Sequence, residues 1–187
     1  ESEIRQAYER LAQVTAILRE AADELETSSD PWSWCSAADL CRTWQSVLDV
    51  RRDESEWDRW GRHCQADALR EALQTLARFA AGHGSSRKSA IRFDRDMPEL
   101  CFDVTIAGRQ LPETCHLFDG SPSLGDLDAW KVDANQWARL AGAVRRVRSV
   151  GGSVRFERVA TSGRAAAQCR YQFSLVVPVE LQPPDLA

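Results

Sequence analysis

The sequence predicts an α+β fold: a two-layer sandwich in which helices cover one face of an antiparallel-rich mixed sheet, preceded by a long N-terminal helix. Segments with apolar residues three and four positions apart, as in amphipathic helices, are followed by segments that alternate apolar and polar residues, as half-buried strands do. The expected strands also come in pairs joined by short connections, as antiparallel neighbours do. We expect residues 1–28 to form the helix, 31–181 the domain and 182–187 a tail.

The long helix is expected over residues 3–26, a stretch without Gly or Pro. Apolar and small residues recur there in a heptad pattern, which is typical of a coiled-coil seam. The seam consists of Ile4, Ala7, Leu11, Val14, Leu18, Ala21 and Leu25. It favours a homodimer through a parallel coiled coil or a helical bundle. The alternative is one helix that folds back onto its own domain through the same stripe.

The domain is expected to open with a break at residues 27–35, which hold a proline and several turn formers. A second helix is expected within 36–50 and a third over 66–81, with a polar stretch between them to which we assign no element. In both helices the apolar residues repeat at helical spacing along one face, so each is expected to cover the sheet with that face.

The strands are expected in two pairs, separated by a loop and one more helix over 134–149. Alternation of apolar and polar residues predicts the strands, and Met97-Pro98 marks the turn within the first pair. The expected strands are 89–96, 100–108, 152–160 and 169–179, the last two joined by the short loop 161–166.

Composition excludes several classes of function. The chain has a formal net charge of -4, which gives no electrostatic argument for nucleic acid or an anionic membrane as a partner. No apolar run reaches the roughly 18 residues of a membrane span. The six cysteines form no C-x-x-C pair and the three histidines show no ligand spacing, so we expect no metal site and reduced thiols in a cytoplasmic protein.

The segment 140–179, "LAGAVRRVRSVGGSVRFERVATSGRAAAQCRYQFSLVVPV", resembles the C-terminal third of the Bergerat-type (GHKL) ATP-binding domain of sensor histidine kinases. In that family a helix ends in an Arg-rich turn, Gly-Gly opens a strand, and a short Gly loop leads to a final Phe-containing strand closed by Pro. Upstream, "DALREALQTLARFAAGHG" is similar to the family's N-box helix, and "FDVTIAGRQLP" to the strand that carries its first glycine box. Phe118 stands near the Phe that often precedes the family's lid.

The resemblance implies a degraded nucleotide site. The corresponding positions are Phe79, His83, Ile106, Gly108, Ala138 and Leu140. Phe79 stands where the family has an Asn that helps bind Mg²⁺, and Ile106 where it has the Asp that accepts from adenine. Ala138 and Leu140 stand at glycines of the phosphate loop. A phenyl ring cannot ligate a hard cation and the sec-butyl side chain of isoleucine cannot accept a hydrogen bond. His83 and Gly108 keep the family's residue types.

These departures favour an inactive histidine-kinase-like module with no cofactor, which acts by binding a response regulator or sensor kinase. Exposed Trp and Arg residues are enriched at interface hot spots. The candidate contacts are Trp130, Trp137, Arg139, Arg145, Arg146 and Arg148. The alternatives are core packing for the tryptophans and a solvated helix face for the arginines.

Two enzymatic alternatives remain open. A divergent kinase would bind ATP and Mg²⁺ through substitute ligands such as Asp103, Asp119 or Asp126. A histidine phosphotransferase would need an acceptor His on a dimer helix, and the helix expected over 3–26 contains no His, so that acceptor would lie outside this sequence. A further alternative is a pocket for an apolar small ligand where nucleotide would otherwise bind.

Overall fold

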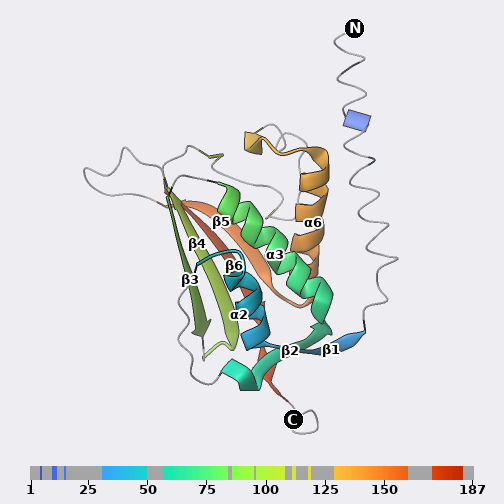
Figure 1. Cartoon of the computed structure of the whole chain (residues 1–187), viewed down its shortest axis with the longest axis vertical. Coiled ribbons are helices and arrows are strands. Elements are labelled where there is room, and N and C mark those ends of the chain that lie inside the picture. The colour runs from blue at the N-terminus through green and yellow to red at the C-terminus, as the bar shows by residue number, and fades with distance from the viewer. Residues whose placement is uncertain are drawn as a thin grey trace, which may run out of the picture.

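A computed structural model gives the arrangement of the chain (Figure 1). It describes residues 31–49, 57–83, 86–94, 96–107, 111–112, 118, 129–159 and 170–182, and the single positions 5, 10, 11 and 15. Most of the expected N-terminal helix, including Ile4, Val14, Leu18 and Leu25, lies outside the described residues. Leu11 is described and is 63% exposed. The dimerisation seam stays a prediction.

The larger sheet has four strands in the order β3-β4-β6-β5 (Figure 1). Its strands are β3 (Ser86–Asp94), β4 (Glu99–Ala107), β5 (Ser153–Val159) and β6 (Arg170–Pro178). All of its pairings are antiparallel, so the mixed character expected from the sequence is absent from this sheet. The two strand pairs predicted from alternation are confirmed.

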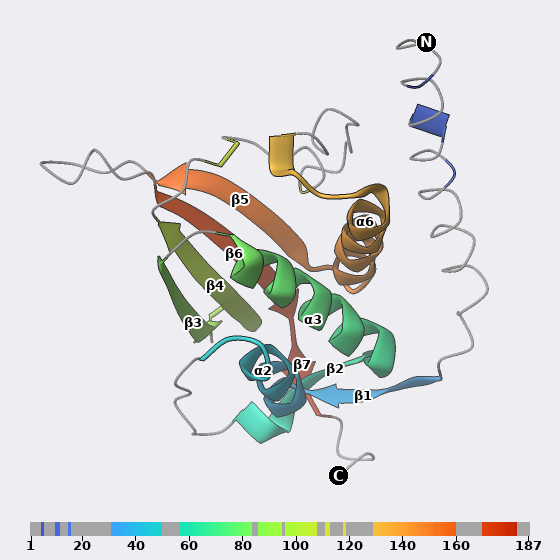
Figure 2. The same cartoon turned by 45° about the horizontal axis from the view of Figure 1, so that its top comes forward.

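Three helices lie on the same side of this sheet, as Figures 1 and 2 both show. They are α2 (Ala37–Gln45), α3 (Ala66–Gly82) and α6 (Ala134–Ser149). The apolar residues of the central strands face them: Phe102 pairs in register with Leu175, and Val104 with Phe173. All four side chains are buried in the core between the helices and the sheet. The expected two-layer arrangement is therefore confirmed.

A second, three-stranded sheet was not expected. It contains β1 (Trp32–Ser36), β2 (Trp60–Gln65) and β7 (Glu180–Leu181), in the order β1-β2-β7. The prediction of a break at residues 27–35 was wrong for residues 32–35, and the polar stretch before α3 ends in a short 3-10 turn (Trp57–Arg59) and β2. These strands are short and partly exposed, so their sequences lack the extended alternation that marks a strand.

Helix α2 is fixed to the large sheet by Trp44. Ser36 caps the N-terminus of the helix, since its hydroxyl accepts from the Asp39 backbone N–H at 3.1 Å. Trp44 is completely buried, and its ring centroid lies 5.1 Å from that of Phe102. Its indole Nε1 donates to the Ser89 hydroxyl at 3.2 Å. One side chain thus joins α2 to two strands.

The Gly-Gly pair after α6 turns the chain back onto the sheet. Gly151 has a φ of +81°, a left-handed conformation that favours glycine. Gly152 donates its backbone N–H to the Val147 carbonyl at 2.9 Å. A Cβ at Gly152 would lie 2.5 Å from the Val176 carbonyl oxygen of β6. The first glycine therefore supplies a backbone conformation and the second supplies the space between α6 and β6.

The described cysteines are free, and three of them, Cys35, Cys41 and Cys64, are completely buried. A hydrogen bond with Cys64, together with burial, raises the pKa of the Cys35 thiol well above its usual range. Burial also raises the pKa of the half-buried Cys101. Only the thiolate is strongly nucleophilic, so both effects suppress reaction with alkylating reagents.

We therefore expect iodoacetamide at about pH 8 to leave peptides containing Cys35, Cys41 and Cys64 unmodified in the folded protein, and to modify all of them in urea. Peptide mass spectrometry measures the modified fraction. Cys101, which is partly exposed, serves as the internal comparison and should react first among these four. Native-state modification of Cys35 as fast as that of Cys101 would contradict this expectation.

Candidate functional site

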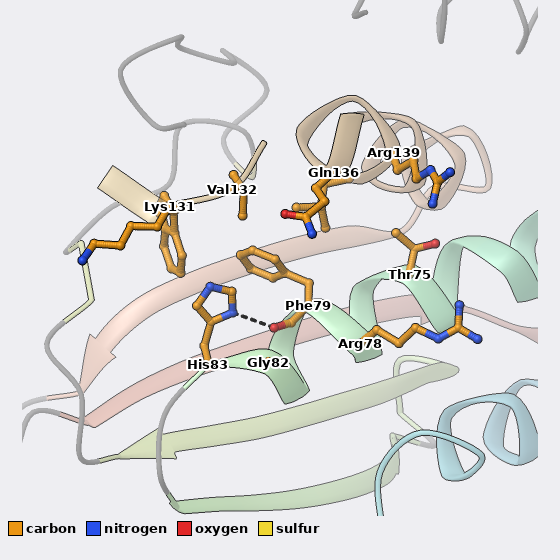
Figure 3. Close-up of a pocket in the computed structure, with 11 residues that line it drawn as sticks. Thr75, Arg78, Phe79, Gly82, His83, Lys131, Val132, Gln136 and Arg139 are labelled. Atoms are coloured by element: carbon orange, nitrogen blue, oxygen red, sulfur yellow. Dashed lines mark hydrogen bonds between the residues drawn. The ribbon is translucent and has the colours of Figure 1, made fainter. Parts of the chain in front are cut away.

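A pocket of about 440 Å³ lies between helix α3 and helix α6 (Figure 3). It is bounded by one face of α3, by the first turns of α6 and by the segment that leads into α6. The lining residues are Thr75, Arg78, Phe79, Gly82, His83, Trp130, Lys131, Val132, Gln136, Arg139 and Leu140. On each helix they follow the three- and four-residue spacing of a single face, which is why both helices present them to the same space.

Aromatic rings close the pocket on the side of the sheet. The ring centroid of Phe79 lies 4.4 Å from that of His83, 5.3 Å from Trp130 and 5.8 Å from Phe118. Trp130 in turn packs edge-on against Phe156 of β5 at 4.8 Å. We call these five residues the aromatic cluster. It joins α3, the segment before α6, and the sheet.

His83 ends helix α3 and is buried in the aromatic cluster. Its Nδ1 lies 2.7 Å from the Phe79 carbonyl oxygen (Figure 3). Because a carbonyl oxygen only accepts, Nδ1 carries the proton of this bond. The bond satisfies one of the carbonyl groups that a helix leaves unpaired at its C-terminus. In this structure His83 thus has a capping and packing role.

The N-terminus of α6 is closed by its own side chains. The Asp133 carboxylate accepts from the Gln136 backbone N–H at 2.8 Å, and the Gln136 side-chain oxygen accepts from the Asp133 backbone N–H at 3.4 Å. This reciprocal pair is a capping box. It places a negative charge at a helix end that otherwise attracts anions.

Three cationic side chains line the pocket: Arg78, Lys131 and Arg139. No Asp or Glu is among the lining residues. Within the described part of the chain, none of the three cations forms an ion pair or a side-chain hydrogen bond. Lys131 also has a φ of +53°, a conformation that is uncommon for a residue with a Cβ.

Solved structures similar to this chain include histidine kinases. The catalytic domain of histidine kinase ThkA, in a nucleotide-free form, matches with a TM-score of 0.50 and 13% identity over 79% of this chain and 95% of that one. The mycobacterial sensor histidine kinase MprB matches with a TM-score of 0.52 and 15% identity over 81% and 100%. Full-length ShkA in complex with AMPPNP matches with a TM-score of 0.54 and 12% identity over 99% and 39%.

The chain has the fold of a histidine kinase catalytic domain. No protein-family model matches the sequence. No curated protein matches it either. The likeness is therefore one of three-dimensional arrangement, at sequence identities of 12–15% in these three comparisons.

The positions that the family resemblance singled out lie in helix, strand and core. Phe79 is half-buried in the aromatic cluster, and Ile106 on β4 is 2% exposed. Ala138 and Leu140 are buried within α6, past the capping box. Gly108 lies outside the described residues. The structure thus brings Phe79, His83 and Leu140 together at the pocket and places Ile106 in the core.

Asp103, a substitute ligand considered from the sequence, does not line the pocket. Successive residues of a strand point to opposite faces, so Asp103 lies on the face of β4 opposite to Ile106. There it accepts from Arg92 at 2.6 Å, Ser174 at 2.7 Å and Gln172 at 3.1 Å. Asp119 and Asp126 lie outside the described residues.

The expectation that Trp130 and Trp137 are exposed contact residues was wrong. They are 3% and 1% exposed, because Trp130 belongs to the aromatic cluster and Trp137 lies on the buried face of α6. Their indole Nε1 atoms have no hydrogen-bond partner in the described part of the chain. Core packing, the alternative considered for them, is what the structure has.

The arginines of α6 differ in their surroundings. Arg146 forms a salt bridge with Glu71 of α3 at 3.2 Å, and Arg148 donates to the Phe118 carbonyl. Both therefore hold the α3–α6 layer and the aromatic cluster together. Arg139 lines the pocket, and Arg145 is exposed. Sequence reasoning missed the pocket cations Arg78 and Lys131, although the spacing of Thr75, Arg78, Phe79 and Gly82 already defines one helix face.

Within the described residues, no helix is both long and apolar enough to cross a bilayer. The same residues contain no group of three or more His, Cys, Asp or Glu side chains arranged to hold a metal ion.

Proposed function

We propose that this chain is a catalytically inactive histidine-kinase-like module of two-component-type signalling, which acts in the cytoplasm by binding another signalling protein. The observation that carries the proposal is the environment of Phe79. At the position where the family places a magnesium-binding Asn, this chain has a phenyl ring packed among His83, Phe118 and Trp130.

The chemistry of the pocket supports the loss of magnesium binding. Mg²⁺ requires near-octahedral oxygen ligands, usually with one or two protein carboxylates. The lining residues offer no carboxylate. The side-chain oxygen of Gln136 already accepts a hydrogen bond in the capping box. A metal–nucleotide complex would therefore have to supply almost all of its own ligands.

The start of α6 supports the loss of phosphate binding. Nucleotide phosphates bind well where backbone N–H groups at a helix N-terminus are free and no side chain blocks their approach. Here the Asp133 carboxylate already accepts a hydrogen bond from the Gln136 backbone N–H at 2.8 Å. The carboxylate is also negatively charged, as a phosphate is. Repulsion of this kind costs about 1 kcal/mol or more at a partly exposed site.

The fold supports a place in two-component signalling, since the similar structures are histidine kinases. A chain that keeps this fold without the nucleotide site would act by contact, with a response regulator or a sensor kinase as its partner. The heptad seam at residues 3–26 would supply a homodimer.

Isothermal titration with ATP and with AMPPNP, each with and without Mg²⁺, tests the loss of the nucleotide site. We expect no magnesium-dependent binding up to about 1 mM nucleotide, a level at which even a 4 kcal/mol interaction is half-saturated. An active histidine kinase catalytic domain titrated under the same conditions is the positive control. Saturable, magnesium-dependent binding would overturn the proposal and favour a divergent kinase.

A further inference from the structure

We propose that the pocket between α3 and α6 binds an organic anion with a flat apolar body, the class represented by aromatic carboxylates. This inference rests on the proposed function, because it requires a pocket that magnesium–nucleotide does not occupy. It assigns to the degraded nucleotide site a ligand of different chemistry.

The size and the apolar lining of the pocket suit the body of such a ligand. Small-molecule pockets commonly have volumes of about 300–1,000 Å³, and this one measures about 440 Å³. Phe79, Val132 and Leu140 supply apolar surface from three separate elements. Figure 3 shows the Phe79 ring projecting from α3 toward the segment before α6 that carries Val132. A flat ring can pack against the phenyl group at little entropic cost, because Phe79 is already held by its neighbours.

The charges around the pocket suit the anionic group. Arg78, Lys131 and Arg139 give the lining three positive charges. The Asp133 carboxylate at the start of α6 adds one negative charge next to the pocket, where it is held in the capping box, so the three cations outweigh it. Figure 3 shows Lys131 on one side of Phe79, with its ammonium group directed outward, and Arg78 of α3 and Arg139 of α6 on the other side. An apolar space with cations on both sides attracts a ligand that is apolar in the middle and negative at its periphery.

The backbone conformation of Lys131 is an independent indication that this edge of the pocket has a ligand-binding role. A left-handed conformation costs a residue with a Cβ about 1 kcal/mol or more relative to glycine. The chain keeps a lysine there at a φ of +53°. Strained residues of this kind concentrate at ligand-binding positions, where the function of the side chain explains why the strained conformation is kept. The residues on either side, Trp130 and Val132, line the same pocket.

The test uses 2-naphthoate, its neutral analogue 2-naphthalenemethanol, and the fluorescent aromatic sulfonate 8-anilinonaphthalene-1-sulfonate. We expect one molecule of the sulfonate to bind per chain and to be displaced by naphthoate. The neutral analogue should displace it at least about tenfold more weakly, since it makes the same apolar contacts without the charge. Equal displacement by the acid and the alcohol would overturn the proposal, as would the absence of saturable binding.

Charge-removing variants locate the site. Lys131→Gly removes the cation and relieves the backbone strain, so the variant should fold at least as well as the parent chain. Combined with Arg78→Gln and Arg139→Gln, it should weaken naphthoate binding at least about tenfold and leave binding of the alcohol unchanged. Lys131→Arg should keep the affinity. Arg155→Gln, which removes an exposed cation on β5 outside the pocket, is the matched control. Unchanged naphthoate affinity in the triple variant would overturn the assignment.

Titration of ATP and Mg²⁺ on the same samples separates the two proposals. Magnesium-dependent ATP binding would overturn the proposed loss of the nucleotide site, whatever naphthoate does. If neither nucleotide nor naphthoate binds, the proposed anion site is overturned, and the proposal of an inactive module stands.

Discussion

Gly152→Ala is expected to lower the free energy of unfolding by about 3 kcal/mol. A methyl group at this position would lie 2.5 Å from the Val176 carbonyl oxygen, 2.7 Å from the Val147 Cγ1 and 2.8 Å from the Val147 carbonyl oxygen. Two of these contacts are backbone atoms held by the α6 turn and by the β5–β6 ladder, so they cannot rotate away. The junction between α6 and the sheet would have to separate.

Urea denaturation followed by far-UV circular dichroism measures this change, with two glycines as controls. Gly82→Ala, at the end of α3, places a methyl group in open space and should stabilise the protein by about 0.5–1 kcal/mol. Gly151→Ala should cost about 1–2 kcal/mol through its φ of +81° alone. A Gly152→Ala midpoint within error of the parent chain would show that α6 and β6 do not approach as closely as described.

Trp44→Ala is expected to lower the free energy of unfolding by about 3–5 kcal/mol, the range typical of removing a large buried aromatic side chain. Trp44 is completely buried, contacts Phe102 and donates to the Ser89 hydroxyl. Its removal leaves a cavity between α2 and the sheet, and the short helix has no second aromatic anchor among its described residues. The melting temperature should fall by about 10 °C or more.

Two variants separate the packing of Trp44 from its hydrogen bond. Ser89→Ala removes only the hydroxyl and should cost about 1 kcal/mol. Trp44→Phe keeps much of the ring volume and should fall between Ser89→Ala and Trp44→Ala. Calorimetry or thermal circular dichroism measures the stabilities of the three variants and so gives their order. An alanine variant no less stable than Trp44→Phe would contradict the role of Trp44 in fixing α2.

Most helices and the large sheet could be predicted because their local patterns agree with their final environment. Helix α3 has Leu69, Leu73 and Leu76 on one face, and that face is buried. Strand β6 alternates buried and half-buried residues along its length, with Tyr171, Phe173 and others toward the core. In both cases the period of the apolar residues matches the geometry of the element.

The small sheet could not be predicted because its order comes from contacts distant in sequence. Strand β1 contains tryptophans on what becomes a partly exposed face, and β7 has only two residues. Gly61 permits the close approach of β1, since a Cβ there would lie 2.5 Å from the Cys35 carbonyl oxygen. Such a requirement leaves no periodic signal in the sequence.

The sequence by itself determined the two-layer plan and the turn at Gly151 and Gly152, while the replacement of polar nucleotide-site positions by Phe79 and Ile106 stays a prediction from the family resemblance. These depend on residue types and on short spacings, which act locally. Only the tertiary structure decided that Trp130 and Trp137 are buried, and that Arg78, Lys131 and Arg139 line one pocket. The physical reason is that burial and charge clustering arise where separate elements pack together, and no single helix or strand contains that information.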